Sequence, residues 1–81
     1  MSETPWIVVR FSNEVGKPIE LMVEPWATQV TVQPGARFAV HYLPPSDRAD
    51  TSFAEIYEDM VRFWCEGSTF EVEIDGEMIE T

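Results

Sequence analysis

The residue types that most often perform chemistry are scarce in this chain of 81 residues. His41 is the only histidine and Cys65 the only cysteine. A Ser-His-Asp arrangement could be drawn with Ser46 and Asp47, but the sequence contains no nucleophile elbow around a serine. We expect the acidic neighbour Glu66 to raise the pKa of the Cys65 thiol and keep it unreactive. The sequence therefore predicts no catalytic residue, and the protein is not expected to be an enzyme.

Three acidic residues, Glu71, Glu73 and Asp75, alternate with apolar ones and would share one face of a strand. Residues two apart on a strand stand about 6.6 Å apart, whereas calcium holds its oxygen ligands at about 2.4 Å. Neighbours on one strand cannot easily share an ion. We expect a solvated acidic face that is a candidate for interaction, with no metal site and no cofactor.

Trp26 is the most suggestive aromatic residue, because it follows Glu24 and the strand-ending Pro25. Two interpretations stay open. The indole caps one end of the core, or it stands exposed and anchors a partner.

The charge is strongly negative and unevenly spread. Fifteen acidic and five basic residues give a net charge of −10. Residues 1–46 carry four acids and three bases, and residues 47–81 carry eleven acids and two bases. Such a field repels nucleic acids and anionic membranes. A basic protein partner or a cation is compatible with it, and the sequence does not define the oligomeric state.

Crowding is expected within the acidic half, since outward residues on paired strands lie about 4.5–5.5 Å from their neighbours across the ladder. Repulsion between carboxylates would raise some of their pKa values. The hypothesis predicts a less stable protein at pH 8 than at pH 5.5.

The chain predicts one domain, residues 1–81, in the cytoplasm. The first residues lack the basic start and apolar run of a signal peptide. No stretch approaches the roughly 20 apolar residues of a membrane span. A single cysteine forms no internal disulfide, which suits a reducing compartment.

Alternating apolar residues predict short strands. They lie over residues 6–11, 19–24, 28–33, 37–43, 69–75 and 77–80. Pro34-Gly35 predicts a type II turn joining the third and fourth of these into a hairpin, and Asp75-Gly76 predicts a two-residue hairpin turn. The inward positions form the expected core: Leu21, Val23, Val30, Val32, Phe38, Val40, Phe70, Val72 and Ile74. His41 falls on the opposite, outer face.

Residues 53–65 allow two interpretations. A helix near 52–64 would be capped by Ser52 and Glu55, giving an α+β fold. A hairpin of strands 53–57 and 61–65 agrees better with strand propensity and with the strands that follow. We therefore expect an all-β fold, a small antiparallel sandwich or barrel of seven to eight short strands.

Several segments resemble small uncharacterised bacterial β-rich proteins. They are Glu24-Pro25-Trp26, Pro34-Gly35, Phe63-Trp64-Cys65-Glu66-Gly67-Ser68 and Asp75-Gly76. That resemblance implies a bacterial origin and β structure, but no activity. The spacing of Phe11, Asn13, Gly16 and Pro18-Ile19 is also similar to the start of the von Hippel–Lindau β-domain, a peptide-binding sandwich. This second resemblance implies a sandwich and carries no site residue.

These observations favour a non-enzymatic acidic module that interacts with or inhibits another protein. The alternative is a module that binds a small molecule or a cation. The candidate interaction residues are Trp26, Glu71, Glu73 and Asp75.

Overall fold

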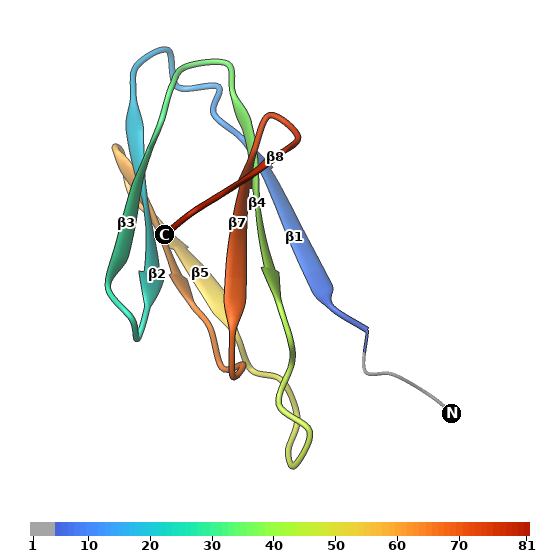
Figure 1. Ribbon diagram of the computed structural model, residues 1–81. Helices are drawn as coiled ribbons and strands as arrows, with labels where there is room; N and C mark the ends of the chain where they lie inside the picture. The colour runs from blue at the N-terminus through green and yellow to red at the C-terminus, as the bar shows by residue number, and fades with distance from the viewer. Residues whose placement is uncertain (1–4) are drawn as a thin grey trace.

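Two four-stranded sheets face each other in a computed structural model that describes residues 5–81 (Figure 1). The strands are β1 (Ile7–Ser12), β2 (Ile19–Glu24), β3 (Thr28–Val32), β4 (Arg37–Tyr42), β5 (Phe53–Ile56), β6 (Met60–Trp64), β7 (Phe70–Ile74) and β8 (Glu77–Ile79). One sheet has the order β1-β4-β7-β8 and the other β3-β2-β6-β5. Residues 5–81 contain no helix, so nothing helical in this part of the chain could cross a membrane. The expected all-β sandwich is confirmed.

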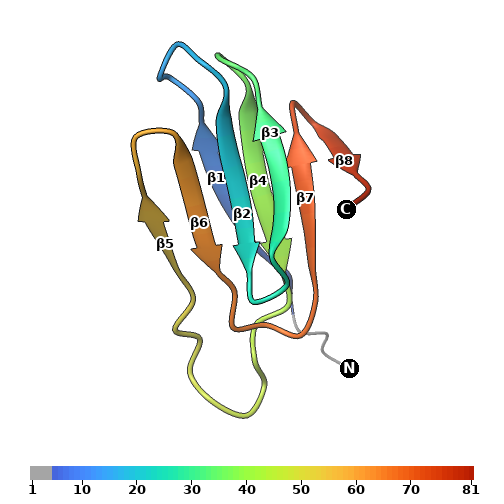
Figure 2. The same cartoon turned by 90° about the vertical axis from the view of Figure 1, so that its left-hand side faces the viewer.

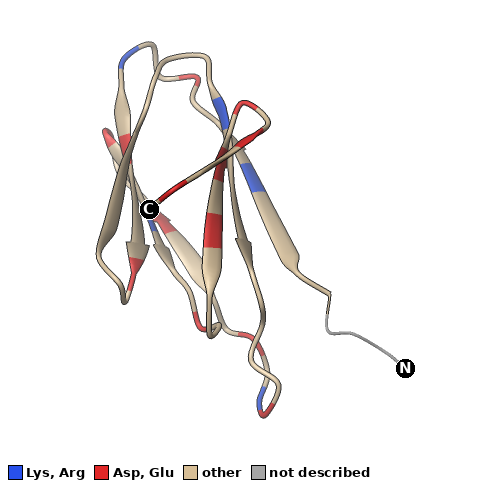
Figure 3. Cartoon of the chain, in the orientation of Figure 1, with Lys and Arg blue, Asp and Glu red and all other residues tan. Residues whose placement is uncertain are grey.

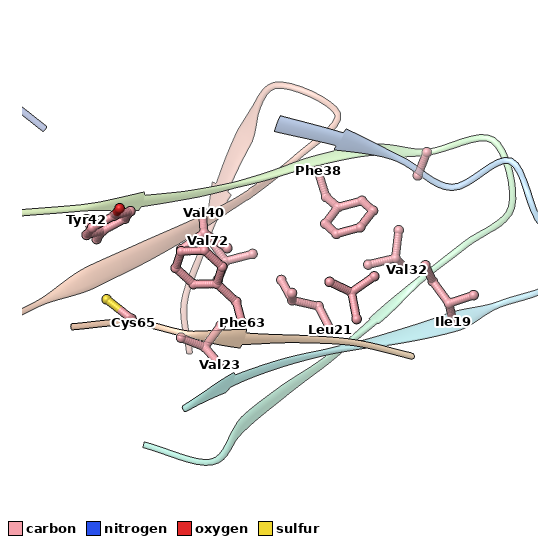
Figure 4. Close-up of a cluster of buried hydrophobic side chains, with 12 residues drawn as sticks. Ile19, Leu21, Val23, Val32, Phe38, Val40, Tyr42, Phe63, Cys65 and Val72 are labelled. Carbon is pink, nitrogen blue, oxygen red and sulfur yellow. The ribbon is translucent and has the colours of Figure 1, made fainter. Parts of the chain in front are cut away.

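The core lies between the sheets and follows the predicted alternation (Figure 4). Leu21, Val23, Val40 and Val72 are fully buried. The remaining predicted core positions are buried or pack against the buried cluster: Val30, Val32, Phe38, Phe70 and Ile74. Apolar burial of this kind is the main favourable term in folding. It fixes the register of each strand, because a slip of one residue would move that strand's apolar side chains from the core to the solvent face.

The ambiguous segment is a hairpin, and the helix alternative is wrong. β5 and β6 pair antiparallel, with Glu58 and Asp59 at the turn. Val61 and Phe63 of β6, and Cys65 directly after it, are then buried in the core. A helix here would have left β2 without the neighbour that β6 supplies.

The predicted hairpin of residues 28–43 is not formed, because β3 and β4 belong to different sheets. The turn itself is present: Ala36 donates its N–H to the Gln33 carbonyl, and Gly35 has a positive φ of 82°. β4 pairs instead with β1 and β7. A local turn signal predicts the reversal of the chain but not its pairing partner.

Asn13 fixes this passage between sheets. Its backbone N–H bonds to the carbonyl of Ala36, and its carbonyl accepts the N–H of Gly35. Its side-chain amide donates to the carbonyls of Val32 and Lys17. These bonds satisfy a polar side chain that is only 1% exposed.

One pair departs from the antiparallel expectation. β2 and β6 run parallel. Residues 25–59 lie between them, which exceeds the dozen or so residues that a parallel crossover requires. The other ladders are antiparallel, including the predicted β7–β8 hairpin, whose Asp75 and Gly76 both have positive φ.

The two sheets are offset sideways. Figure 2 shows β5 projecting beyond β1 on one side of the sandwich, while β8 projects beyond β3 on the other. Each overhanging strand ends its own sheet. The inward-facing side of β5 is therefore left without a strand opposite it.

Candidate functional site

The three predicted acidic residues do not form one site. Glu71 is exposed. Glu73 lies beside His41, with 2.7 Å between Glu73 Oε1 and His41 Nε2. Its other carboxylate oxygen lies 3.7 Å from the Arg10 guanidinium. Asp75 sits in the β7–β8 turn, where its carboxylate accepts the backbone N–H of Arg37. His41 is on the outer face as predicted, but its side chain is only 15% exposed. Two of the three acids, Glu73 and Asp75, are therefore already engaged in contacts within the protein.

Crowding of acids across the ladders is not observed, so this expectation is wrong. Figure 3 shows acidic residues spread over both sheets and the loops. Within the register of the eight strands, Glu71 faces His41, Glu55 faces Arg62, and Glu20 faces Thr31 and Met60. No acid in these ladders stands opposite another. The predicted lower stability at pH 8 relied on repulsion between opposite carboxylates, so it loses its structural basis.

Trp26 lies in the β2–β3 turn and combines both interpretations. Its ring centre is 4.6 Å from that of Phe70, at the start of β7, so it covers one end of the core. It is nonetheless 41% exposed. The structure places it apart from Asp75, which is at the other end of β7.

Cys65 and the metal-ligating residue types were the remaining candidates from the sequence. Cys65 is buried, and this burial raises the pKa of its thiol. Among residues 5–81, no three His, Cys, Asp or Glu side chains converge in a way that could hold a metal ion.

A polar network fixes the loop that leads into β5. The Tyr42 hydroxyl donates to Asp50 at 2.5 Å, and Asp50 accepts both the N–H and the hydroxyl of Ser52. The Ser52 oxygen in turn accepts the N–H of Glu66 at 2.8 Å. Burial and the Asp50 bond raise the pKa of Tyr42 to about 12, and the bonds from Ser52 and Tyr42 lower that of Asp50. Ser52 directly precedes β5, so this network sets where the strand begins.

β5 is the edge of its sheet and carries the two most exposed large apolar side chains of residues 5–81, with a third exposed ring directly after it. Ile56 is 77% exposed, Phe53 54% and Tyr57 47%. The strand has no proline, no lysine and no bulge, which are three of the features that protect an edge from pairing, and its only charged residue is Glu55. β3, the opposite edge, presents Gln29 and Thr31 instead.

Aromatic and charged side chains line the outer face beside this edge. The rings of Phe53 and Trp64 stack with their centres 6.4 Å apart. The Trp64 indole donates to Glu55 at 2.9 Å. The Arg62 guanidinium lies 6.0 Å from the Trp64 ring centre and 3.4 Å from Glu24. These contacts hold Phe53 and Glu55 in place at the rim of the sheet.

Sequence reasoning did not select β5 as a site. A signal was present, since Phe53 and Ile56 lie an odd number of residues apart and so face opposite sides of a strand. A short strand that is apolar on both faces is either covered on both or available to a partner. Only the offset of the sheets decides between these outcomes.

An open hollow of about 440 Å³ lies near the start of the loop, between residues 44–48 and 66–68. Arg48 is its basic residue, and it pairs with Asp47 and Glu66 at 3.4 and 3.3 Å. The lining is mainly polar, and its single arginine is paired with both of its carboxylates, which leaves a net charge of −1.

Comparison with known proteins identifies no relative. No family model matches the chain, and neither a curated protein nor a solved structure matches it. The two resemblances stated from the sequence stay predictions.

Proposed function

We propose that this protein is a non-enzymatic interaction module that binds another protein through the edge strand β5. The observation that carries the proposal is the exposure of Phe53, Ile56 and Tyr57 on an edge that nothing covers within residues 5–81. Apolar side chains exposed on both faces of one edge strand are available to a partner at that edge. An unprotected strand edge adds unpaired backbone groups to that surface.

The surrounding charge supports a basic partner. Residues 47–66 carry six acids and two arginines, a net charge of −4. Carboxylates around an apolar centre steer basic surfaces and repel acidic ones. The same charge argues against nucleic acid and anionic membranes as partners. A cytoplasmic location belongs to the proposal.

The test is capture of partners by tagged protein from the lysate of its source, comparing Ile56→Asp with wild type. We expect the wild type to retain specific proteins and Ile56→Asp to lose them, because a carboxylate replaces the central apolar contact. Both proteins should show the same melting temperature, since Ile56 contributes little to the core.

The matched control is Met78→Asp on β8. Met78 is 53% exposed and also lies on an edge strand, but in the other sheet. We expect Met78→Asp to capture the same proteins as the wild type. Retention by Ile56→Asp, or equal loss with both variants, would contradict the proposal.

The second candidate function is binding of a small polar molecule in the hollow beside Arg48, which is the observation that favours it. Substituting Arg48→Ala should then weaken binding of a small polar compound that a thermal-shift screen detects. This candidate would be excluded if no compound raised the melting temperature of the wild type more than that of Arg48→Ala.

A further inference from the structure

We propose that β5 receives an extended segment of the partner as an additional strand of its sheet, and that this segment alternates basic and apolar residues. The inference rests on the proposed function and specifies the chemistry of the partner. It is carried by the direction of the backbone groups on β5, by the side chains on its two faces, and by the local charge.

The backbone N–H and C=O groups of Ala54 and Ile56 point away from β6, outward from the edge of the sheet. At the hairpin turn, Tyr57 donates its N–H to the Met60 carbonyl at 2.8 Å. In an antiparallel pair, residues that exchange hydrogen bonds alternate with residues that do not. Counting back from Tyr57, Glu55 and Phe53 bond to β6, so Ala54 and Ile56 offer two N–H and two C=O groups to an incoming strand.

The two faces of β5 differ in chemistry. Glu55 and Phe53 share the outer face with Arg62 and Trp64, to which they are paired. Ala54 and Ile56 are on the inward-facing side, and both are exposed. An added strand would continue this alternation, because opposite residues on paired strands share a face.

The expected partner sequence follows from this geometry. A residue opposite Glu55 would lie on the outer face next to a carboxylate and the Phe53 ring, where lysine or arginine is favoured. Residues opposite Ala54 and Ile56 would lie on the inward-facing side, where β-branched apolar residues are favoured. The partner segment is therefore apolar-basic-apolar, with strand propensity.

Charge selects a foreign segment over a second copy of this chain. Two copies joined along β5 would bring two segments of net charge −4 together, with Glu55, Glu58 and Asp59 from each. Like charges across a ladder are destabilising. A lysine-bearing strand meets the same groups with the opposite sign.

Space for the added strand is present. β5 overhangs β1, so its free side faces no other strand of residues 5–81 (Figure 2). Its four residues are in register with β6, without a bulge to twist the edge away. Recognition by strand addition obtains affinity from main-chain bonds and specificity from alternate side chains.

The direct test uses short blocked peptides of alternating lysine and valine, with binding followed by fluorescence anisotropy. The unmodified peptide should bind, and binding should weaken with added sodium chloride. The acidic counterpart, alternating glutamate and valine, should not bind.

N-methylated forms of the lysine peptide isolate the backbone bonds. In an antiparallel pairing, methylation at the valines removes the N–H groups that face β5, and should weaken binding by about tenfold or more, since each lost bond contributes about 1 kcal/mol. Methylation at the lysines alters N–H groups that point away from β5, and should leave binding close to that of the parent. Equal binding of the two methylated forms would overturn strand addition.

A variant of the protein tests the same bonds from the other side. Ala54→Pro removes an N–H that does not bond to β6, a position where edge strands tolerate proline. We expect a fold close to wild type and peptide binding at least fivefold weaker. Ile56→Ala keeps its N–H and serves as the control for side-chain loss. If Ala54→Pro does not fold, the methylated peptides still decide the matter with wild-type protein.

The two proposals fail in different ways. Loss of lysate capture in Ile56→Asp, combined with equal binding of both methylated peptides, would reject strand addition but keep β5 as the interface. Retained capture in Ile56→Asp would reject the interface itself. A dimer of the wild type that Ala54→Pro dissociates would assign the edge to a second copy and overturn the basic-partner inference.

Discussion

β5 and β7 differ in what covers the inner side of each strand. Each is a short strand with apolar side chains directed toward the inner side of its sheet. Val72 on β7 is fully buried, whereas Ile56 on β5 is 77% exposed. β7 lies between β4 and β8, while β5 ends its sheet and overhangs the strand opposite.

The difference shows that strand periodicity identifies which face a side chain occupies, but not whether anything covers that face. Coverage depends on strand order and on the offset of the sheets, which are properties of the whole fold. The consequence is functional, because the uncovered apolar strand is the one that remains available to a partner.

The largest contrast is expected from placing a carboxylate at the two equivalent positions. Val72→Asp buries an unpaired charge, which costs several kcal/mol and should abolish cooperative folding. Ile56→Asp leaves its charge in water, and should change the free energy of unfolding by less than about 0.5 kcal/mol. Urea unfolding followed by tryptophan fluorescence measures both.

A marked destabilisation by Ile56→Asp would show that β5 is covered in solution. It would remove the basis for treating this strand as a binding edge. A fully folded Val72→Asp variant would instead show that the core beneath β7 is more open than the structure indicates.

The fold was largely predictable because its elements follow local rules. Alternation at Leu21, Val40 and Val72 predicted the core, and Asp75-Gly76 predicted a hairpin. Pairing was less predictable. The Pro34-Gly35 turn joins two sheets, because the two edges of β4 are occupied by β1 and β7.

The candidate site was mostly missed, since exposure of Ile56 arises from what is absent opposite it. Glu73 was selected for its acidic pattern, yet the pairing of β7 with β4 brings it against His41, diagonally across the ladder. Such pairing depends on residues 32 positions apart in the chain, and alternation within one strand carries no information about it.

A smaller effect is expected where the loop before β5 is anchored. Tyr42→Phe removes the hydroxyl that donates to Asp50, and should lower the free energy of unfolding by about 1–2 kcal/mol at neutral pH. This variant tests whether the bond between Tyr42 and Asp50 helps to hold the start of β5 in place, although β5 itself is uncovered.

The pH dependence provides a second measurement of the same contact. The folded protein holds the Tyr42 proton up to a pKa of about 12, whereas the unfolded chain releases it near 10. The wild type should therefore lose stability as pH rises from about 10 toward 12, and Tyr42→Phe should lack that contribution. Tyr57→Phe, at the other tyrosine, is the control and should keep the alkaline decline. An unchanged decline in Tyr42→Phe would show that Tyr42 is not its source.

The smallest effect is expected on the acidic face of β7, and it separates an internally paired surface from a binding one. Glu73 lies against His41 and Arg10 with its side chain only 19% exposed, whereas Glu71 is exposed. Glu73→Gln should lower the free energy of unfolding by about 0.5–1 kcal/mol, the upper part of the range for surface ion pairs, and Glu71→Gln should leave it unchanged. Neither variant should alter capture of the partner, because the proposed contact is on the opposite sheet. If Glu71→Gln reduced capture as strongly as Ile56→Asp, the acidic face of β7 would be part of the interface, and the contrast between the two strands would no longer predict where this protein binds.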